Sequence, residues 1–194
     1  MVNLKNNILT LVWEGPYTIK SKELFDEERP GLYLFTVKTN ESYSVHYIGM
    51  SRSLTSRIVG ELRDYISGRY YLYNSDKLKL NIKEEDYHLK DYYEEFFSNL
   101  EKYQTIARNF LESISFFLCT FDKNTTYFNE NTTYFEIAES ILISHIFSNK
   151  QDFLILDNSK KISKKIYGCG LSINNEFPKG VSVTGLTDLI NAPV

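Results

Sequence analysis

The pattern of hydrophobic and polar positions opens with two β-rich runs, residues 31–38 and 42–49. Thr39, Asn40 and Glu41 lie between them, which favours a hairpin turn. Successive side chains of a strand point to opposite faces, so each run alternates between two faces, and His46 is expected to point away from Tyr47. In the first run Tyr33, Phe35 and Val37 are expected to share one face, and in the second Tyr43, Val45 and Tyr47 are. Tyr33 and Tyr47 are then expected to point outward from the same sheet.

Helical spacing begins directly after the hairpin. From Ser53 onward, apolar residues recur at helical intervals, and Gly68 is a stop signal. These apolar residues are Leu54, Ile58, Leu62 and Tyr65, with Arg57, Glu61 and Asp64 expected together on the helix's other side. Further along, residues 84–112 are acidic and aromatic and predict one or two helices, and the apolar run 114–121 predicts a buried strand.

A further helix is predicted from about Thr133. At 100° per residue, Phe135, Ala138, Leu142 and Ile146 form an apolar stripe, with Ser140 and Ser144 opposite. Glu136 falls beside the serines. Glu139, in contrast, falls on the apolar side, where a carboxylate needs a cation, a metal or hydrogen-bond donors. An ordinary ion pair with a Lys or Arg at the helix edge would also satisfy Glu139.

Together these elements predict an α+β fold in a single domain, 1–194. Its expected centre is a small antiparallel three-stranded sheet flanked by helices. A helical insertion is expected at 68–112, with extensions at the N- and C-terminal ends. The heavy load of 15 Tyr and 13 Phe argues against disorder.

Composition narrows the functional classes only slightly. A net charge of −3 does not favour nucleic-acid binding, although a local basic patch would suffice for it. The best such patch is Lys160, Lys161, Lys164 and Lys165, which could equally be a solvated face. Two cysteines fit neither a disulfide framework nor a zinc site. With no apolar run long enough for a membrane and no signal-peptide pattern, a cytoplasmic protein is expected.

The order of several short motifs carries a family resemblance. Gly31-Leu32-Tyr33, then Tyr47-Ile48-Gly49, then Ser51 and Arg57 on a following helix and Glu139 on a later one, resemble the GIY-YIG nuclease superfamily. The resemblance covers roughly residues 31–67 and 114–147. The flanks, with Trp13-x-Gly-Pro and a tyrosine-rich segment after the first helix, resemble a bacterial restriction-like subgroup.

The resemblance implies a metal-dependent endonuclease that hydrolyses phosphodiester bonds of DNA, with RNA not excluded. It implies that Glu139 holds one divalent metal, Mg²⁺ or alternatively Mn²⁺, through oxygen. Tyr33 and Tyr47 would handle the water, and Arg57 would clamp the phosphate. Gly31 and Gly49 would permit close approach at the strand ends, and Asn158 would help to order the site. The implied residues would then converge on one concave patch.

Glu61 departs from the family pattern, in which His or Tyr is common at this position. It could act as a base, serve as a second metal ligand, or hold Arg57 at i,i+4 and weaken catalysis. Tyr33 and Tyr47 could likewise be ordinary cross-strand aromatic residues. The competing functional hypotheses are therefore a catalytically weakened nucleic-acid-binding module and a protein-interaction role for the insertion. The sequence leaves the oligomeric state open, a homodimer included.

Overall fold

The computed structural model describes residues 2–26, 28–39, 42–80, 82, 84–87, 98–121, 127–129, 132–148, 166 and 168–193. The helices in these ranges are η1 (Lys22–Phe25, a 3-10 helix), α1 (Leu54–Ile66), α2 (Ser75–Lys79), α4 (Leu100–Ser113) and α5 (Tyr134–Ser148). None of them is long and apolar enough to cross a bilayer.

The strands in the same ranges are numbered β1 to β13 in chain order. They are β1 (Val2–Lys5), β2 (Ile8–Val12), β3 (Glu14–Tyr17), β4 (Gly31–Lys38), β5 (Tyr43–Ser51), β6 (Leu72–Tyr73), β7 (Glu85–Tyr87), β8 (Ile114–Thr120), β9 (Tyr127–Asn129), β10 (Thr132–Thr133), β11 (Ser172–Glu176), β12 (Val183–Thr184) and β13 (Leu189–Asn191). The mixture of helices and strands confirms the predicted α+β class.

The central sheet has five strands in the order β12-β5-β4-β8-β3. The predicted hairpin, β4 and β5, and the predicted buried strand, β8, are antiparallel and form its middle. The expectation of a three-stranded antiparallel sheet is wrong, because the terminal extensions add a strand to each edge. β3 pairs antiparallel with β8, and β12 pairs parallel with β5.

A bulge in β5 changes which side chains share a face. Phe35 is opposite Tyr47 and Thr36 is opposite Val45, so His46 is the extra residue. The expectation is confirmed for Tyr33, Phe35, Val37 and Tyr47, which lie in one core cluster, and wrong for Tyr43 and Val45, which lie in the other. His46 is also not directed away from Tyr47; it is buried on that side, near the rings of Tyr73 and Phe110.

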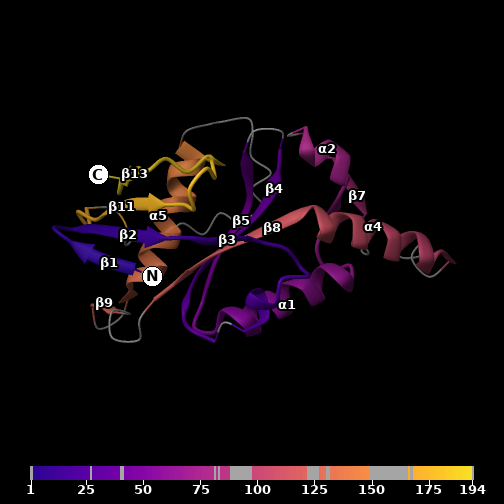
Figure 1. The fold of residues 1–194 in the computed structure, drawn as a ribbon, viewed down its shortest axis with the longest axis horizontal. Helices are drawn as coiled ribbons and strands as arrows, with labels where there is room; N and C mark the ends of the chain where they lie inside the picture. The colour runs from indigo at the N-terminus through magenta and orange to yellow at the C-terminus, as the bar shows by residue number, and fades with distance from the viewer. Residues whose placement is uncertain are drawn as a thin grey trace.

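The first face of the central sheet is covered by α1, α4 and the short elements between them (Figure 1). α1 begins at Leu54, next to the predicted start at Ser53, which is its N-cap, and Leu54, Ile58 and Tyr65 are buried. Glu61 is buried too, contrary to the expectation that it lies on the outer side. Within the insertion, residues 100–113 form the predicted helix, whereas 85–87 form the strand β7.

The second face is covered by α5, and behind it lies a second sheet (Figure 1). That sheet has the order β1-β2-β11-β13, in which β2 and β11 from opposite ends of the chain pair in parallel. Since α5 packs between the two sheets, it is not an amphipathic surface helix. Ser140 and Ser144, expected opposite an apolar stripe, are both buried.

Candidate active site

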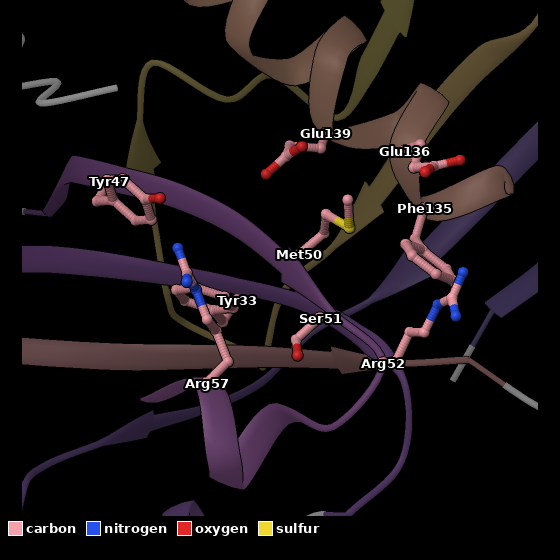
Figure 2. A pocket seen from close by; sticks show the side chains of 9 residues that line it. All are labelled: Tyr33, Tyr47, Met50, Ser51, Arg52, Arg57, Phe135, Glu136 and Glu139. Carbon is pink, nitrogen blue, oxygen red and sulfur yellow. The ribbon is translucent and has the colours of Figure 1, made fainter. Parts of the chain in front are cut away.

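A pocket of about 510 Å³ opens between the hairpin, the start of α1 and the start of α5. Figure 2 shows its walls: β4 and β5 form the floor, α5 lies above, and α1 begins below. The residues that line it are Tyr33, Tyr47, Met50, Ser51, Arg52, Arg57, Phe135, Glu136 and Glu139. Four residues proposed from sequence as catalytic, Tyr33, Tyr47, Arg57 and Glu139, therefore lie around one cavity.

Tyr33, Arg57 and Glu61 form a hydrogen-bonded cluster at one end of this pocket. The Tyr33 hydroxyl accepts a hydrogen bond from Arg57 Nε at 3.2 Å and donates to Glu61 Oε1 at 3.3 Å. Arg57 Nη2 is also 2.5 Å from Glu61 Oε1. The Glu61 side chain is only 4% exposed, whereas the Arg57 side chain is 48% exposed. Glu61 thus supports the cluster from behind and does not line the pocket.

Burial governs the protonation of this cluster. It raises the pKa of Tyr33 far above its ordinary value, with the neighbouring Tyr47 and Glu61 adding to the effect. Burial also raises the pKa of Glu61, against the opposing influence of Arg57 and of hydrogen bonds from Tyr33 and Tyr70. Tyr33 is consequently neutral at physiological pH, and its proton is directed at Glu61.

The two tyrosines differ in their access to the pocket. Tyr33 has no exposed surface, and Arg57 lies over it in Figure 2. Tyr47 is partly exposed, and its hydroxyl is directed into the cavity. Burial and the charge of Glu61 raise the pKa of Tyr47, while its interactions with Arg57 and Tyr33 oppose the rise. Of the two, Tyr47 is the tyrosine that a molecule in the pocket can reach.

Position 49 requires a glycine because Tyr33, its partner across the β4–β5 ladder, packs directly against it. A Cβ at Gly49 would collide with the Tyr33 ring and hydroxyl. Gly31 is constrained differently, since a Cβ there would meet the main-chain oxygen of Cys119 on β8. Both glycines follow from close packing in the sheet, and Gly49 in particular gives the Tyr33 hydroxyl its position.

Gly49→Ala is therefore expected to displace the Tyr33 hydroxyl and to lower the free energy of unfolding by about 1–3 kcal/mol, as overpacking does. Urea unfolding measures this loss. The matched control is Gly60→Ala in α1, where an added Cβ meets nothing within 4 Å. Because alanine favours helix, that variant should gain up to about 1 kcal/mol. Equal stability of the two variants would contradict the role given to Gly49.

Glu139 projects from α5 toward the pocket (Figure 2). Desolvation raises its pKa to about 7, while the charge of Arg57 and a hydrogen bond from the Met50 main chain oppose the rise. The expected ordinary ion pair at a helix edge is not what the structure has: within the described residues Glu139 forms no ion pair. A half-buried carboxylate of this kind gains most from a cation in the pocket.

The carboxylates on this wall fit a hydrated divalent cation. Glu136 also lines the pocket, although its carboxylate accepts a hydrogen bond from the Thr133 main chain at 2.7 Å, as in a capping box. Among the described residues no group of three or more His, Cys, Asp or Glu side chains is placed to hold a metal. Mg²⁺ often takes only one or two carboxylates and keeps several waters, so Glu139, with or without Glu136, suits it.

Other sequence predictions have different outcomes. Asn158 and the lysines Lys160, Lys161, Lys164 and Lys165 lie outside the described residues. Ser51, one element of the resemblance, lines the pocket. Met50 and Arg52 also line it and were not predicted from the sequence, although they lie directly beside Ser51 after the Tyr-Ile-Gly motif. Tyr70 was not predicted either; its only signal was a place in the tyrosine-rich segment after α1.

Comparison of the chain with protein-family models, with curated proteins and with solved structures finds no match.

Proposed function

We propose that this protein is a metal-dependent endonuclease of the GIY-YIG type that hydrolyses phosphodiester bonds of DNA. The observation that carries the proposal is the shared pocket of Tyr33, Tyr47, Arg57 and Glu139. These residues come from four separate elements, β4, β5, α1 and α5. The pocket combines the three kinds of group that phosphodiester hydrolysis needs: a cation for the phosphate, a carboxylate for a metal and polar groups for water.

Arg57 is the phosphate-binding group in this proposal. Its Nε and Nη2 are engaged by Tyr33 and Glu61, which holds the planar guanidinium in one orientation. About half of its side chain is exposed, so donors remain for non-bridging phosphate oxygens. A guanidinium held in advance can stabilise the charge that develops in the transition state without reorganising.

Tyr47, Tyr33 and Glu61 form a route for the proton of the attacking water. In the proposed step, the water gives a proton to the Tyr47 hydroxyl, Tyr47 passes its own proton to Tyr33, and Tyr33 passes its proton to Glu61 Oε1. The stacked contact of the Tyr47 and Tyr33 rings, with centroids 5.9 Å apart, provides the first internal link, and the hydrogen bond from Tyr33 to Glu61 provides the second. Neither tyrosine then needs to be an anion, which suits their raised pKa values.

Glu139 would hold the divalent cation, with Glu136 beside it. When bound, such a cation supplies a Lewis acid for a phosphate oxygen and makes water more acidic. The role of the chain here is to keep a carboxylate half-buried and close to the phosphate clamp. Binding requires the ionised form of Glu139, so the affinity for the metal should rise as the pH passes about 7.

A plasmid-cleavage assay with Mg²⁺ or Mn²⁺ tests the proposal. The parent protein should nick or linearise supercoiled DNA, and EDTA should stop the reaction. Tyr47→Phe should lower the rate by about a hundredfold, as expected for a lost proton-transfer group. The matched control is Tyr43→Phe, on the same strand but in the other core cluster. The assignment would be contradicted if the parent did not cleave DNA in the presence of Mg²⁺ or of Mn²⁺. An equal loss of rate in both tyrosine variants would contradict it too.

One observation favours a second candidate, a nucleic-acid-binding module with little activity. The ion pair with the buried Glu61 offsets the charge of Arg57, and so weakens its attraction for a phosphate in the transition state. This candidate predicts DNA binding without cleavage under either metal. The same plasmid assay, combined with a gel-shift measurement, separates the two functions.

A further inference from the structure

Arg52 is a cationic group in the pocket that the proposed reaction does not use. It lies between the end of β5 and Ser53, the N-cap of α1, and its side chain is exposed. It forms no hydrogen bond or ion pair with the residues that the structure describes. Arg57, in contrast, is tied to Tyr33 and Glu61. Within the part of the chain that the structure describes, all donors of Arg52 are therefore available for a ligand.

The position of Arg52 complements that of Arg57. In Figure 2 the Arg57 guanidinium lies at the end of the pocket near Tyr47, whereas Arg52 lies at the opposite end near Phe135. Glu139 lies between these two ends. A volume of about 510 Å³ exceeds what a single phosphate group fills and falls in the range of sites for whole small ligands. The pocket has room for a segment of a strand that extends from one arginine to the other.

The backbone that carries Arg52 is held by its neighbours. Ser51 Oγ donates to the Ser53 main-chain oxygen at 2.7 Å and accepts from the Ser53 main-chain nitrogen at 3.1 Å. Ser53 Oγ donates to Glu28 Oε2 at 2.8 Å. Binding would therefore have to order the Arg52 side chain but not its main chain. The positive end of the α1 dipole at the same turn adds to the attraction for an anion.

We propose that Arg52 forms a second phosphate subsite, which binds the phosphate next to the one that Arg57 clamps on the same DNA strand. The inference rests on the proposed nuclease function and extends it. Two guanidinium groups, one at each end of the pocket, would bind two successive phosphates and leave the bond at Arg57 beside Glu139. Arg52 is thus a positioning residue, which contributes through binding and acts before the chemical step.

The expected effect of Arg52→Ala is on affinity. Loss of one charge-assisted contact should raise KM for a short DNA duplex by about tenfold and leave kcat within about twofold. The magnitude of the slope of log K against log salt should fall by about one unit, which corresponds to the loss of one phosphate contact. The matched control is Arg63→Ala, an exposed arginine of α1 that pairs with Asp64 and does not line the pocket. Arg63→Ala should behave like the parent.

The decisive experiment uses duplexes in which single phosphates are replaced by uncharged methylphosphonates on either side of a mapped cleavage site. In the parent, neutralising one phosphate adjacent to the cleaved bond should weaken binding by about tenfold. In Arg52→Ala the same replacement should cost nothing further, because the contact is already absent. Arg52→Lys should recover part of the loss, since it keeps the charge but not the planar fork.

The outcomes separate the subsite from the function on which it rests. If the parent cleaves DNA but Arg52→Ala responds to every methylphosphonate as the parent does, the subsite is overturned and the nuclease proposal stands. If the parent neither binds nor cleaves DNA, both are overturned. A loss of kcat in Arg52→Ala with unchanged KM would also overturn the subsite, because it would place Arg52 in the chemical step.

Discussion

Glu139→Gln is expected to abolish most cleavage while making the folded protein more stable at pH 8. The substitution keeps the shape of the side chain but removes the charge that would hold a divalent cation. Metal polarisation contributes several kcal/mol to such reactions, and each 1.36 kcal/mol is a factor of ten in rate. The rate of plasmid cleavage should therefore fall by about a hundredfold or more.

The stability gain follows from the raised pKa of Glu139. Its pKa is about 7 in the folded chain, against 4.5 for an ordinary glutamate. The folded state therefore holds the proton more tightly, and the resulting stabilisation is present below pH 4.5 and lost as the pH rises through 7. At 1.36 kcal/mol per pKa unit, the ionised carboxylate costs up to about 3 kcal/mol at pH 8. The glutamine does not ionise, so it avoids this cost.

Urea unfolding at pH 8 and pH 4.5 measures the effect. Glu139→Gln should exceed the parent by about 1–3 kcal/mol at pH 8 and match it at pH 4.5. Added Mg²⁺ should raise the melting temperature of the parent but not of the variant. Glu101→Gln, on an exposed part of α4, is the control and should change neither quantity. Equal pH dependence in parent and variant would refute this account of Glu139.

The second large effect is expected at the pair of Arg57 and Glu61. Arg57→Leu removes the proposed phosphate clamp, so cleavage should fall by about 10²–10³, the usual cost of a lost transition-state donor. It also leaves the buried Glu61 carboxylate without its cation. Removing one partner of a fully buried pair costs about 3–5 kcal/mol, and since Arg57 is half exposed we expect about 2 kcal/mol at pH 8.

A double variant separates stability from chemistry at this pair. Arg57→Leu combined with Glu61→Gln removes both charges and leaves an amide oxygen that can accept from Tyr33. Urea unfolding should show most of the lost stability restored, whereas plasmid cleavage should stay at the level of Arg57→Leu. The single variant should also recover stability at acid pH, where Glu61 can protonate. Recovery of cleavage in the double variant would show that Arg57 is not the clamp.

The local helices and strands of the fold could be predicted from the sequence. Alternating apolar residues predicted β4 and β5, a continuous apolar run predicted β8, and helical spacing predicted α1 and α5, because these patterns depend on which side chains must be buried. The region of α4 was predicted as helical from its acidic and aromatic composition. The bulge at His46 could not be predicted from the sequence, because an extra residue in one strand leaves the hydrophobic alternation on either side of it intact. The bulge alone places His46 and Tyr47 on the same face of the sheet and Tyr43 and Val45 on the other.

Some of the residues that line the pocket could also be predicted from the sequence. The order of short motifs brought attention to Tyr33, Tyr47, Arg57 and Glu139, and these residues line one cavity. The burial of Glu61 could not be predicted, because the helical pattern put it on the outer side of α1. Only the packing of β4 and of the tyrosine-rich segment against α1 buries it. Arg52 carried no signal in the pattern at all.

The sequence by itself determined the α+β class, the hairpin, the main helices and the residue types of the proposed phosphodiesterase site. These depend on local propensity and on the period of the hydrophobic pattern. Only the tertiary structure decided that β2 and β11 pair from opposite ends of the chain, enclosing α5 between two sheets. Pairing between strands so distant depends on complementary surfaces that a one-dimensional pattern does not encode. Tertiary packing also raises the pKa of Glu139 through burial, and on the opposite face of the central sheet it places Glu61 where it accepts the Tyr33 proton.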